Sequence, residues 1–589
     1  MKILGISAHY HDSAAALVVD GTPVAAVQEE RLSRRKGDAS FPMNAIEWCL
    51  DHASLDPSDL DAVVFYERPM LKFDRILTCT LRAFPRSWRS FPQAMKNSLG
   101  DKVWARGIIS SQLGVPREKI LFTDHHQSHA AAAFLTAPVE RAAILTADGV
   151  GEWATLTAGH GSRGRDGTTI SLKREIRFPH SLGLLYSTFT AYLGFAVNED
   201  EYKVMGLAAY GRPTMVDQVR RVIRRTPDGA FALVPEYFEY HTTAARSYSS
   251  RFIDLFGPPR PAYEPLDIST PNGQRFADCA ASVQRVLEDT LVDIARALHH
   301  ETGLQDLCFG GGVALNGVAN ARILAECGFE RVLVPPAPGD AGCALGAALY
   351  ADRIYFHNQD QAVPDHPFWG PVADGRRLAE VAHEDEQQVE EIDDTGLIER
   401  LATDLAAGRI VGWMDGAAEF GPRALGHRSL LAAAESSDMR DRLNRDIKHR
   451  EEFRPFAPVV PIESADRFFD LPPGGVRLAR FMSGVFPVRP EWRSRLAAVT
   501  HVDGSARVQV LERPMAPRLH GLLEAYGRRT GIPVLLNTSF NVAGEPIVTT
   551  VLEGYSTFRR CGIDVLVAGS TVVTKRASSN TRPAKEDVA

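Results

Sequence analysis

The stretch LCFGGGVALNG, residues 307–317, runs from an apolar strand through three glycines into a helix. The sequence predicts a helix before it at 274–302, and a strand at 331–334 and a helix at 342–355 after it. Strand, glycine turn and helix in alternation predict an α/β fold. Backbone N–H groups in a glycine turn at a helix N-terminus can approach a phosphate closely. The candidate nucleotide-binding residues here are Gly310, Gly311, Gly312 and Asn316.

The beginning of the chain has the shorter period of β-structure. Apolar runs at 2–6, 14–19 and 24–27 are separated by a polar turn at 9–13 and by the Asp20-Gly21 turn, which predicts a β-hairpin-rich start. Helices are expected at 44–52 and 127–136, and strands at 120–122 and 142–147. The turns at 9–13, at Asp148-Gly149 and at the three glycines each follow a strand, so they can converge on one nucleotide.

A basic and aromatic stretch at 71–99 predicts helical pieces broken near Pro85 and Pro92. An amphipathic cover with a solvated face is the first interpretation of this stretch. A docking surface is the alternative.

The composition limits the class of protein. At 589 residues the chain is long enough for at least two domains, and 66 Lys+Arg against 73 Asp+Glu give a net charge of −7. This charge argues against a surface built to bind nucleic acid. The seven cysteines form no CxxC pair, which favours a reducing cytosol. Because no apolar run reaches signal-peptide or membrane-spanning length, we expect a soluble cytoplasmic protein without a membrane partner.

The segment DHHQSHAAAAF places His125 and His129 at i and i+4 on a predicted helix, so both imidazoles project from one face. This spacing suits a divalent metal, although a histidine-rich helix start with one core histidine has the same pattern. Asp148 ends an apolar strand at a glycine turn and could complete the site. Asp340 is a further candidate, but taken alone it is explained more simply as a helix N-cap. Such a mixed set of ligands suits iron(II), manganese, zinc or magnesium.

Two segments of the second half, GPRALGHRS at 421–429 and IKHREEFRPF at 447–456, concentrate cations in an acidic chain. Guanidinium groups bind phosphate and carboxylate through paired hydrogen bonds, which predicts an oligophosphate site, although some of these cations would form ordinary surface ion pairs. The segment 537–541, NTSFN, follows an apolar strand and could add amide and hydroxyl contacts, or be only a polar strand-end turn.

Eleven motifs in a fixed order resemble the O-carbamoyltransferase family of antibiotic-tailoring and nodulation-factor enzymes. They extend over roughly residues 1–573 and comprise HDSAAALVVDG, DHHQSHAAAAF, TADGVGEW, SLGLLYSTFT, KVMGLAAYG, FGGGVALNG, PGDAGCALGAAL, GPRALGHRSLLA, IKHREEFRPFAP, HVDGSARVQ and LNTSFNVAGEPIV.

The resemblance implies an α/β protein with two working domains. Residues 1–365 would form an actin-like ATPase-superfamily domain built from ribonuclease H-like repeats, and 395–574 a YrdC-like domain with a twisted open α/β sheet. Residues 366–394, which are rich in Pro and Gly and then acidic, would be the linker, and 575–589 a disordered tail. Carbamoyl phosphate and ATP would form carbamoyl-adenylate in the second domain. The first domain would then transfer the carbamoyl group to a hydroxyl of a small natural product or sugar.

The resemblance also assigns roles to residues. His125, His129, Asp148 and Asp340 match metal ligands, with iron(II) expected there and magnesium on ATP. His11 matches a histidine implicated in transfer, as a general base or orienting group, and Asp12 would orient its ring. The positions that match the grip on the phosphates and the carbamoyl group are Arg423, Arg428, Lys448, Arg454, Arg507, Asn537, Ser539 and Asn541.

Two other functions compete with this prediction. Transfer to tRNA adenine keeps the chemistry but needs several phosphate contacts, which the acidic chain disfavours. An actin-like ATPase switch without group transfer leaves the arginine-rich motifs of the second half unexplained. The acceptor and the oligomeric state are not encoded in any motif.

Overall fold

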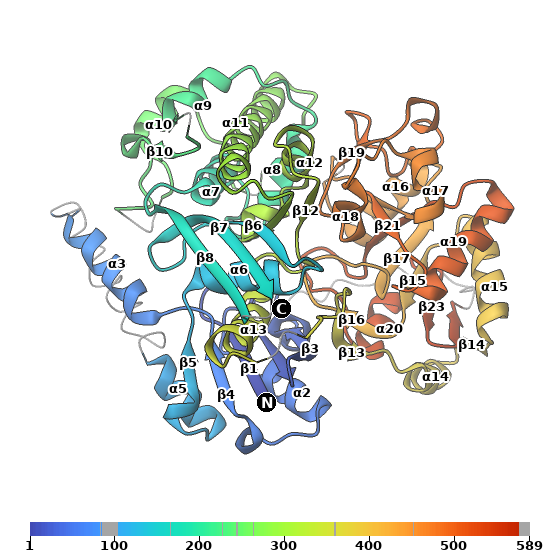
Figure 1. The fold of residues 1–589 in the computed structure, drawn as a ribbon. Helices are drawn as coiled ribbons and strands as arrows, with labels where there is room; N and C mark the ends of the chain where they lie inside the picture. The colour runs from blue at the N-terminus through green and yellow to red at the C-terminus, as the bar shows by residue number, and fades with distance from the viewer. Residues whose placement is uncertain are drawn as a thin grey trace, which may run out of the picture.

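A computed structural model describes residues 1–82, 84, 104–164, 167–226, 228–242, 246–262, 264–358, 361–451 and 453–575. The expected basic and aromatic stretch beyond Arg82 lies almost entirely outside these residues, as does the expected tail after Lys575. Figure 1 shows the N-terminal half on the left, in blue to yellow, and the C-terminal half on the right, in yellow to red.

The N-terminal half contains two sheets with the same topology. The first has the order β3-β2-β1-β4-β5 and the second the order β12-β11-β6-β7-β8. In each, the first three strands are antiparallel neighbours and the next two run parallel to the first. The strands are β1 (Lys2–Ser7), β2 (Ala14–Val19), β3 (Thr22–Gln28), β4 (Ala62–Phe65), β5 (Ile120–Phe122), β6 (Arg141–Ala147), β7 (Ala154–Gly164), β8 (Gly167–Arg177), β11 (Asp306–Gly310) and β12 (Arg331–Leu333). The predicted α/β class and the duplicated ribonuclease H-like unit are confirmed.

Helices connect and cover these sheets. In the first repeat they are α1 (Glu29–Ser33), α2 (Met43–His52), α3 (Pro69–Arg82), α5 (Ala105–Leu113) and α6 (His125–Leu135). The second repeat holds a long insertion between β8 and β11 with α7 (Leu182–Tyr192), α8 (Glu201–Ala208), α9 (Val216–Val222), β9 (Ile223–Arg225), β10 (Phe231–Leu233), α10 (Ser250–Phe256) and α11 (Pro271–Thr302). It ends with α12 (Gly317–Glu326) and α13 (Asp340–Tyr350). Among the described residues, every helix is too short or too polar to cross a membrane.

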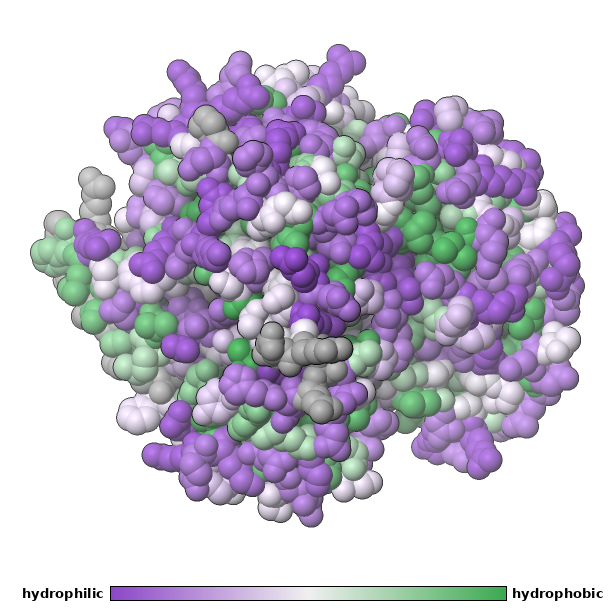
Figure 2. Space-filling model, viewed as in Figure 1, coloured by the Kyte–Doolittle hydropathy of each residue, from purple (hydrophilic) through white to green (hydrophobic). Residues whose placement is uncertain are grey.

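Helix α3 extends away from the first sheet (Figure 1), and its cations Lys72 and Arg75 do not form the solvated face that the sequence predicts. Lys72 is buried against Glu67, with 2.7 Å between the ammonium and the carboxylate, and Arg75 donates to the carbonyl of Gly151 at 2.6 Å. The apolar side chains of Met70, Leu71 and Leu81 are exposed instead. Figure 2 shows the corresponding green surface at the left edge of an otherwise mostly hydrophilic face.

The C-terminal half is an eight-stranded mixed sheet in the order β14-β24-β23-β15-β17-β22-β18-β21. Its strands are β14 (Gln388–Glu391), β15 (Val411–Met414), β17 (Arg428–Ala433), β18 (Ala457–Pro461), β21 (Gln509–Leu511), β22 (Leu535–Ser539), β23 (Val565–Ala568) and β24 (Thr571–Thr574). The helices are α14 (Gly375–Glu384), α15 (Asp394–Ala406), α16 (Ser437–Leu443), α17 (Ile462–Phe468), α18 (Gly475–Arg480), α19 (Pro517–Thr530) and α20 (Val551–Arg560). The leucines of α15 and α19 pack together on one face of this sheet.

The segment 366–394 is folded, in contrast to the predicted linker. It contains β13 (Phe368–Val372), which pairs with β16 (Ala417–Glu419), then α14, and then β14 at the edge of the large sheet. The acidic composition of this segment is typical of a linker. It is equally compatible with an edge strand, which can carry charged side chains on its solvent side.

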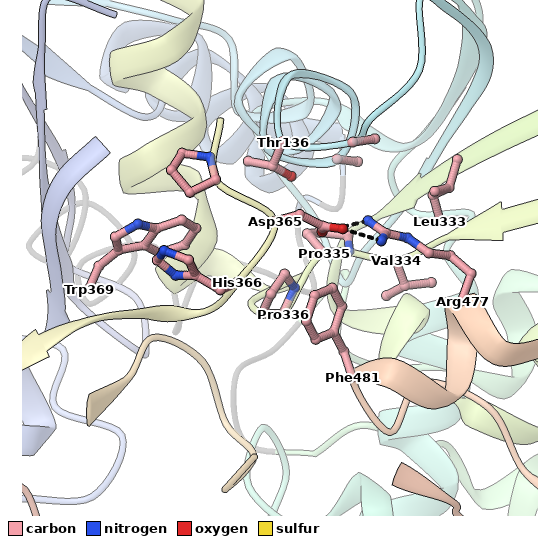
Figure 3. Close-up of a pocket in the computed structure, with 13 residues that line it drawn as sticks. Thr136, Leu333, Val334, Pro335, Pro336, Asp365, His366, Trp369, Arg477 and Phe481 are labelled. Atoms are coloured by element: carbon pink, nitrogen blue, oxygen red, sulfur yellow. Dashed lines mark hydrogen bonds and ion pairs between the residues drawn. The ribbon is translucent and has the colours of Figure 1, made fainter. Parts of the chain in front are cut away.

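The two halves share a continuous core. One cluster of buried side chains includes Phe309 of the second repeat and Met414 and Leu430 of the large sheet. Figure 3 shows another part of the joint, where Asp365 faces Arg477 of α18 beside Pro336 and Phe481. The cavity there is about 10 Å³, which leaves room for at most about one water molecule.

Between the two sheets of the N-terminal half, α6 and α13 follow the fifth strand of their respective repeats and pack against each other (Figure 1). A Cβ atom on Gly346 would lie 2.0 Å from the carbonyl oxygen of Ser128, and one on Gly5 would lie 1.9 Å from that of Ala344. Gly346 of α13 and the alanines of α6 therefore let the two helices approach closely, and Gly5 of β1 does the same for α13 against the first sheet.

We predict that Gly346→Ala lowers the free energy of unfolding by about 1–3 kcal/mol, because its methyl group forces α6 and α13 apart. Gly107→Ala on α5 is the matched control, since its Cβ would meet no atom closer than 3.8 Å. Denaturant titration followed by circular dichroism measures both variants. Equal stability of the two variants would contradict the close-packing requirement.

Candidate functional site

Four buried side chains from three elements converge between the repeats. The Nε2 atoms of His125 and His129 lie 3.1 Å apart, and Nε2 of His125 lies 3.1 Å from a carboxylate oxygen of Asp148. One oxygen of Asp340 lies 3.5 Å from His129 Nε2 and 3.7 Å from His125 Nε2. One ligand atom from each of the four lies within 4.8 Å of all the others. The structure therefore brings together the complete metal-ligand set expected from the sequence.

Local structure explains this convergence. Helix α6 begins at His125, which puts His129 one turn later on the same face. Asp148 follows the last residue of β6, and Asp340 is the first residue of α13 after the N-cap Gly339. The predicted capping role of Asp340 is therefore not observed. Gly151 leaves room for the ring of His125, because a Cβ there would lie 2.9 Å from the imidazole Cδ2 atom.

The donor set fits a divalent cation. Both carboxylate oxygens of Asp340 are buried and accept no hydrogen bond from the described part of the chain. A buried carboxylate that accepts no hydrogen bond is costly, and a cation held by two imidazoles and two carboxylates would reduce that cost. Burial raises the pKa of Asp148, but hydrogen bonds from His125 and His129 outweigh burial and hold that pKa well below its usual value. The carboxylate is thus in the charged form that a metal requires.

His11 lies on the turn between β1 and β2, close to this cluster. Its Nδ1 atom is 3.0 Å from a carboxylate oxygen of Asp12, and Asp12 adopts a positive φ of 52°. Burial lowers the pKa of His11, but the charge of Asp340 and the interaction with Asp12 raise it to about 9. His11 is therefore mostly protonated at neutral pH in the protein alone.

The glycine turn after β11 supports the same cluster. The backbone N–H of Gly312 donates to Asp148 at 3.0 Å, and Gly311 has a φ of 93° where a Cβ would lie 2.2 Å from the carbonyl oxygen of Ala147. The three predicted turns thus lie together. Asn316 caps α12 and exchanges two hydrogen bonds with Gln284, so its side chain is engaged with the protein.

A cavity of about 460 Å³ lies between the two halves. The N-terminal half lines it with α8 and α11, and the C-terminal half contributes the arginines Arg450, Arg454 and Arg507. Burial and the neighbouring charge of Arg454 lower the pKa of Arg507 to about 10, and Arg507 Nε has no hydrogen-bond partner among the described residues. The pKa of Arg450 is also well below its usual value, because of burial and the charge of Arg454. The wall of the cavity therefore carries excess positive charge.

Lys448, Ser539 and Asn541 form one group beside these arginines. The ammonium of Lys448 donates to the side-chain oxygens of Asn541 at 2.8 Å and Ser539 at 3.2 Å. Burial, together with Arg450 and Arg454, holds the pKa of Lys448 well below its usual value. No carboxylate among the described residues pairs with this lysine within 4.0 Å.

Three other predicted residues are occupied by protein contacts. Arg428 is fully buried and donates to backbone carbonyl groups, including those of Thr549 and Pro371. Arg423 bonds to the carbonyl oxygens of Phe481 and Leu315 and so ties the two halves together. The side chain of Asn537 donates to Gln509 and to the carbonyl of Ala424. Further structural contacts of Arg428 are to the carbonyl oxygens of Asp415, Gly416 and His427.

Tyr202 of α8 lines the cavity and Lys203 lies beside the cationic segment 448–454, and the sequence interpretation singled out neither residue. The guanidinium carbon of Arg454 lies 4.6 Å from the centre of the Tyr202 ring, and the ammonium of Lys203 lies 2.9 Å from Glu451. The only indication was the motif KVMGLAAYG at 203–211. The partners are separated by about half the chain, so their pairing was not predictable from local pattern.

Comparison with known proteins now identifies the family. Family models described as the carbamoyltransferase N-terminus and C-terminus match residues 2–349 and 402–575. The chain belongs to the carbamoyltransferase family. Membership confirms the resemblance drawn from the motifs and makes the protein a carbamoyltransferase enzyme.

Its relatives include nodulation proteins. The chain is 36% identical to nodulation protein NolNO of Sinorhizobium fredii, over 97% of this chain and 80% of the relative. It is 42% identical to the uncharacterized protein sll1178 of Synechocystis, over 98% and 97% of the two chains. A solved structure, component A of (R)-2-hydroxyglutaryl-CoA dehydratase from Acidaminococcus fermentans, covers 59% of this carbamoyltransferase and 97% of its own chain, with 14% identity and a TM-score of 0.33.

We predict that Asp340→Asn abolishes the thermal stabilisation of the carbamoyltransferase by Mn²⁺ or Fe²⁺ after chelator treatment. A cation that binds only the folded state stabilises it by about 3 kcal/mol at a hundredfold excess over Kd, and loss of one charged ligand removes this effect. Differential scanning fluorimetry with each cation under anaerobic conditions measures the shift.

His126→Asn is the control for this experiment. The ring of His126 bonds to Thr146 and to the carbonyl of Ala154, and burial and the neighbouring His125 and His129 lower its pKa to about 3, so it is a neutral structural residue. This variant melts at a lower temperature but keeps the cation-dependent shift. A shift that persists in Asp340→Asn, or is absent from the unmodified protein, argues against the metal centre.

Proposed function

We propose that this carbamoyltransferase uses ATP and carbamoyl phosphate to make carbamoyl-adenylate in the cavity between the halves. The carbamoyl group is then transferred to a hydroxyl of a small-molecule acceptor at the His and Asp cluster. Iron(II) is the proposed resident metal, with Mg²⁺ accompanying ATP. The acceptor class is supported by the similarity to nodulation proteins, and the net negative charge disfavours an RNA acceptor.

The observation that carries the proposal is the group of buried cations in the cavity. Arg507 and Lys448 are desolvated and repelled by neighbouring arginines, and Glu451, the acidic group beside them, is bound by Lys203. This group of desolvated, mutually repelling cations lowers the stability of the ligand-free protein. It becomes favourable when phosphate groups enter, because a charge-assisted bond is stronger in a desolvated site.

The reaction itself requires such a site. Formation of carbamoyl-adenylate brings two polyanions together: water releases the phosphate of carbamoyl phosphate, an oxygen of the resulting carbamate attacks the α-phosphorus of ATP, and pyrophosphate departs. Cations positioned beforehand reduce the repulsion between the two substrates and stabilise the departing phosphate and pyrophosphate. Arg454 and Arg507 would hold the phosphates. Lys448, already directed by Ser539 and Asn541, would orient the reacting groups.

At the second site the protein supplies the base and the metal ligands. His125, His129, Asp148 and Asp340 would hold the metal, which when bound supplies positive charge for the phosphate oxygens of the adenylate. A cation held by Asp340 would offset the charge that contributes most to raising the pKa of His11 and so favour the neutral imidazole. Neutral His11 would accept the proton of the acceptor hydroxyl as this oxygen attacks the carbamoyl carbon. Asp12 holds the imidazole by its Nδ1 atom, which leaves Nε2 available.

We predict that Arg507→Met abolishes carbamoyl phosphate-dependent pyrophosphate release while it stabilises the ligand-free protein. A base whose pKa is lower in the folded state destabilises that state at every pH below the folded pKa. Removing a guanidinium whose pKa falls from 12.5 to about 10 raises the free energy of unfolding by about 1–3 kcal/mol at neutral pH.

Arg285→Met is the matched control, because Arg285 also lines the cavity but pairs with Asp289 at 3.0 Å. It retains pyrophosphate release within about threefold, since an exposed ion pair contributes little. Pyrophosphate release is measured as the difference in phosphate between samples with and without pyrophosphatase, because carbamoyl phosphate itself also yields phosphate. Full activity of Arg507→Met, or release that does not need carbamoyl phosphate, would overturn the adenylation proposal.

His11→Ala tests the second half-reaction. We expect it to retain pyrophosphate release but to lower carbamoyl transfer about 10²–10⁴-fold, because general-base catalysis contributes on this scale. Asp12→Asn removes one of the charges that raise the pKa of His11, so the rising limb of the pH–rate profile moves to lower pH. Mass spectrometry of the carbamoylated acceptor follows transfer; loss of pyrophosphate release in His11→Ala would contradict the division between the sites.

A further inference from the structure

We propose that Cys343 is a positioning residue for the metal ligand His129, whose ring it orients through a hydrogen bond at Nδ1. This inference rests on the proposed metal centre. Cys343 is not one of the four candidate metal ligands.

The two ring nitrogens of His129 have different neighbours. Nε2 points to the cluster, 3.1 Å from the corresponding atom of His125 and 3.5 Å from Asp340. Nδ1 points the opposite way, 3.2 Å from the sulfur of Cys343. His129 and Cys343 are both completely buried, so water cannot replace this contact.

Metal binding makes the sulfur an acceptor. An imidazole binds a cation through the lone pair of one nitrogen, so coordination at Nε2 requires the proton at Nδ1. A buried N–H group without an acceptor is unfavourable. In the part of the chain that the structure describes, Cys343 provides the hydrogen-bond partner of Nδ1. Its sulfur therefore favours the tautomer that leaves Nε2 free for metal.

The two histidines differ in this respect. His125 Nδ1 has no hydrogen-bond partner among the described residues. The ring of His125 is positioned by packing, with Gly151 on one side and Tyr66 at 5.3 Å between ring centres. His129 is the imidazole oriented by a hydrogen bond, and the precision of the pair depends on Cys343.

The fold also explains why a small neutral acceptor occupies this position. Cys343 lies one turn after Asp340 on α13, where the close approach of α6 leaves little space. A carboxylate, the commoner partner of a metal-bound histidine, would add a third buried anion beside Asp148 and Asp340. A thiol provides an acceptor without that charge.

Co²⁺ binding to the full-length apoprotein tests the inference. We expect Cys343→Ala to weaken Co²⁺ binding about tenfold, as measured by competition with a chelator, because loss of an outer-shell partner typically costs 10–100-fold in affinity. The visible absorption bands of bound Co²⁺ should change as well, since the freed imidazole no longer keeps one orientation. Cys343→Ser restores an acceptor and recovers most of the affinity.

Cys308→Ala is the matched control, because Cys308 is also completely buried and belongs to the same core cluster as Cys343. It should bind Co²⁺ with the affinity and spectrum of the unmodified protein. Equal affinity of the two alanine variants, whether both unchanged or both weakened, overturns the role of Cys343. Failure of the unmodified protein to bind any cation would instead overturn the metal centre on which the inference depends.

Discussion

The close approach of α6 and α13 is the constraint on which the N-terminal site depends. These helices occupy equivalent positions in the two repeats, each after the fifth strand of its sheet. Gly346 against the backbone of Ser128 brings their N-terminal turns together, so His125 and His129 of one helix face Asp340 of the other. Duplication alone would give two similar helices. The small residues on their contacting faces make a single buried site from both.

Desolvated charge is the second organising feature. The carboxylate of Asp340 accepts no hydrogen bond from the described residues, with the histidine nitrogens 3.5 and 3.7 Å away, and Lys448 and Arg507 are desolvated beside other cations. Neither arrangement stabilises the fold, since a buried charge requires a partner. The large shared core tolerates both. Destabilisation is therefore concentrated at the two places where ionic ligands would relieve it, as expected for sites selected for binding.

The sequence predicts most of the site but only part of the arrangement around it. Local spacing identifies His125 and His129, and motif order identifies Asp148, Asp340 and the cationic segments. Arg428 shows the limit of this approach, because a conspicuous arginine in a basic motif proves to bond to backbone carbonyl groups. Burial and hydrogen-bond saturation depend on the packing of distant segments, so composition cannot distinguish a ligand-binding arginine from a structural one.

Pairing between segments far apart in the chain is the other feature that local sequence pattern cannot predict. The linker prediction for 366–394 fails because the strand β14 finds its partner, β24, almost two hundred residues later. Helix α3 likewise buries Lys72 and Arg75 because their partners, Glu67 and the carbonyl of Gly151, lie beneath the helix. In both segments the sequence correctly indicates many charged residues, but tertiary contacts decide which of these side chains are buried and which are exposed.

The two sites are joined by the insertion of the second repeat. Ser181, the N-cap of α7, donates a hydrogen bond to the carbonyl of Gly149 beside Asp148, one of the candidate metal ligands. The following helix α8 places Tyr202 against Arg454 in the lining of the cavity, and Lys203 against Glu451. Helices α7 and α8 therefore connect the turn at Asp148 with the cations of the other half. Because the halves also share one core, they pack as a single unit.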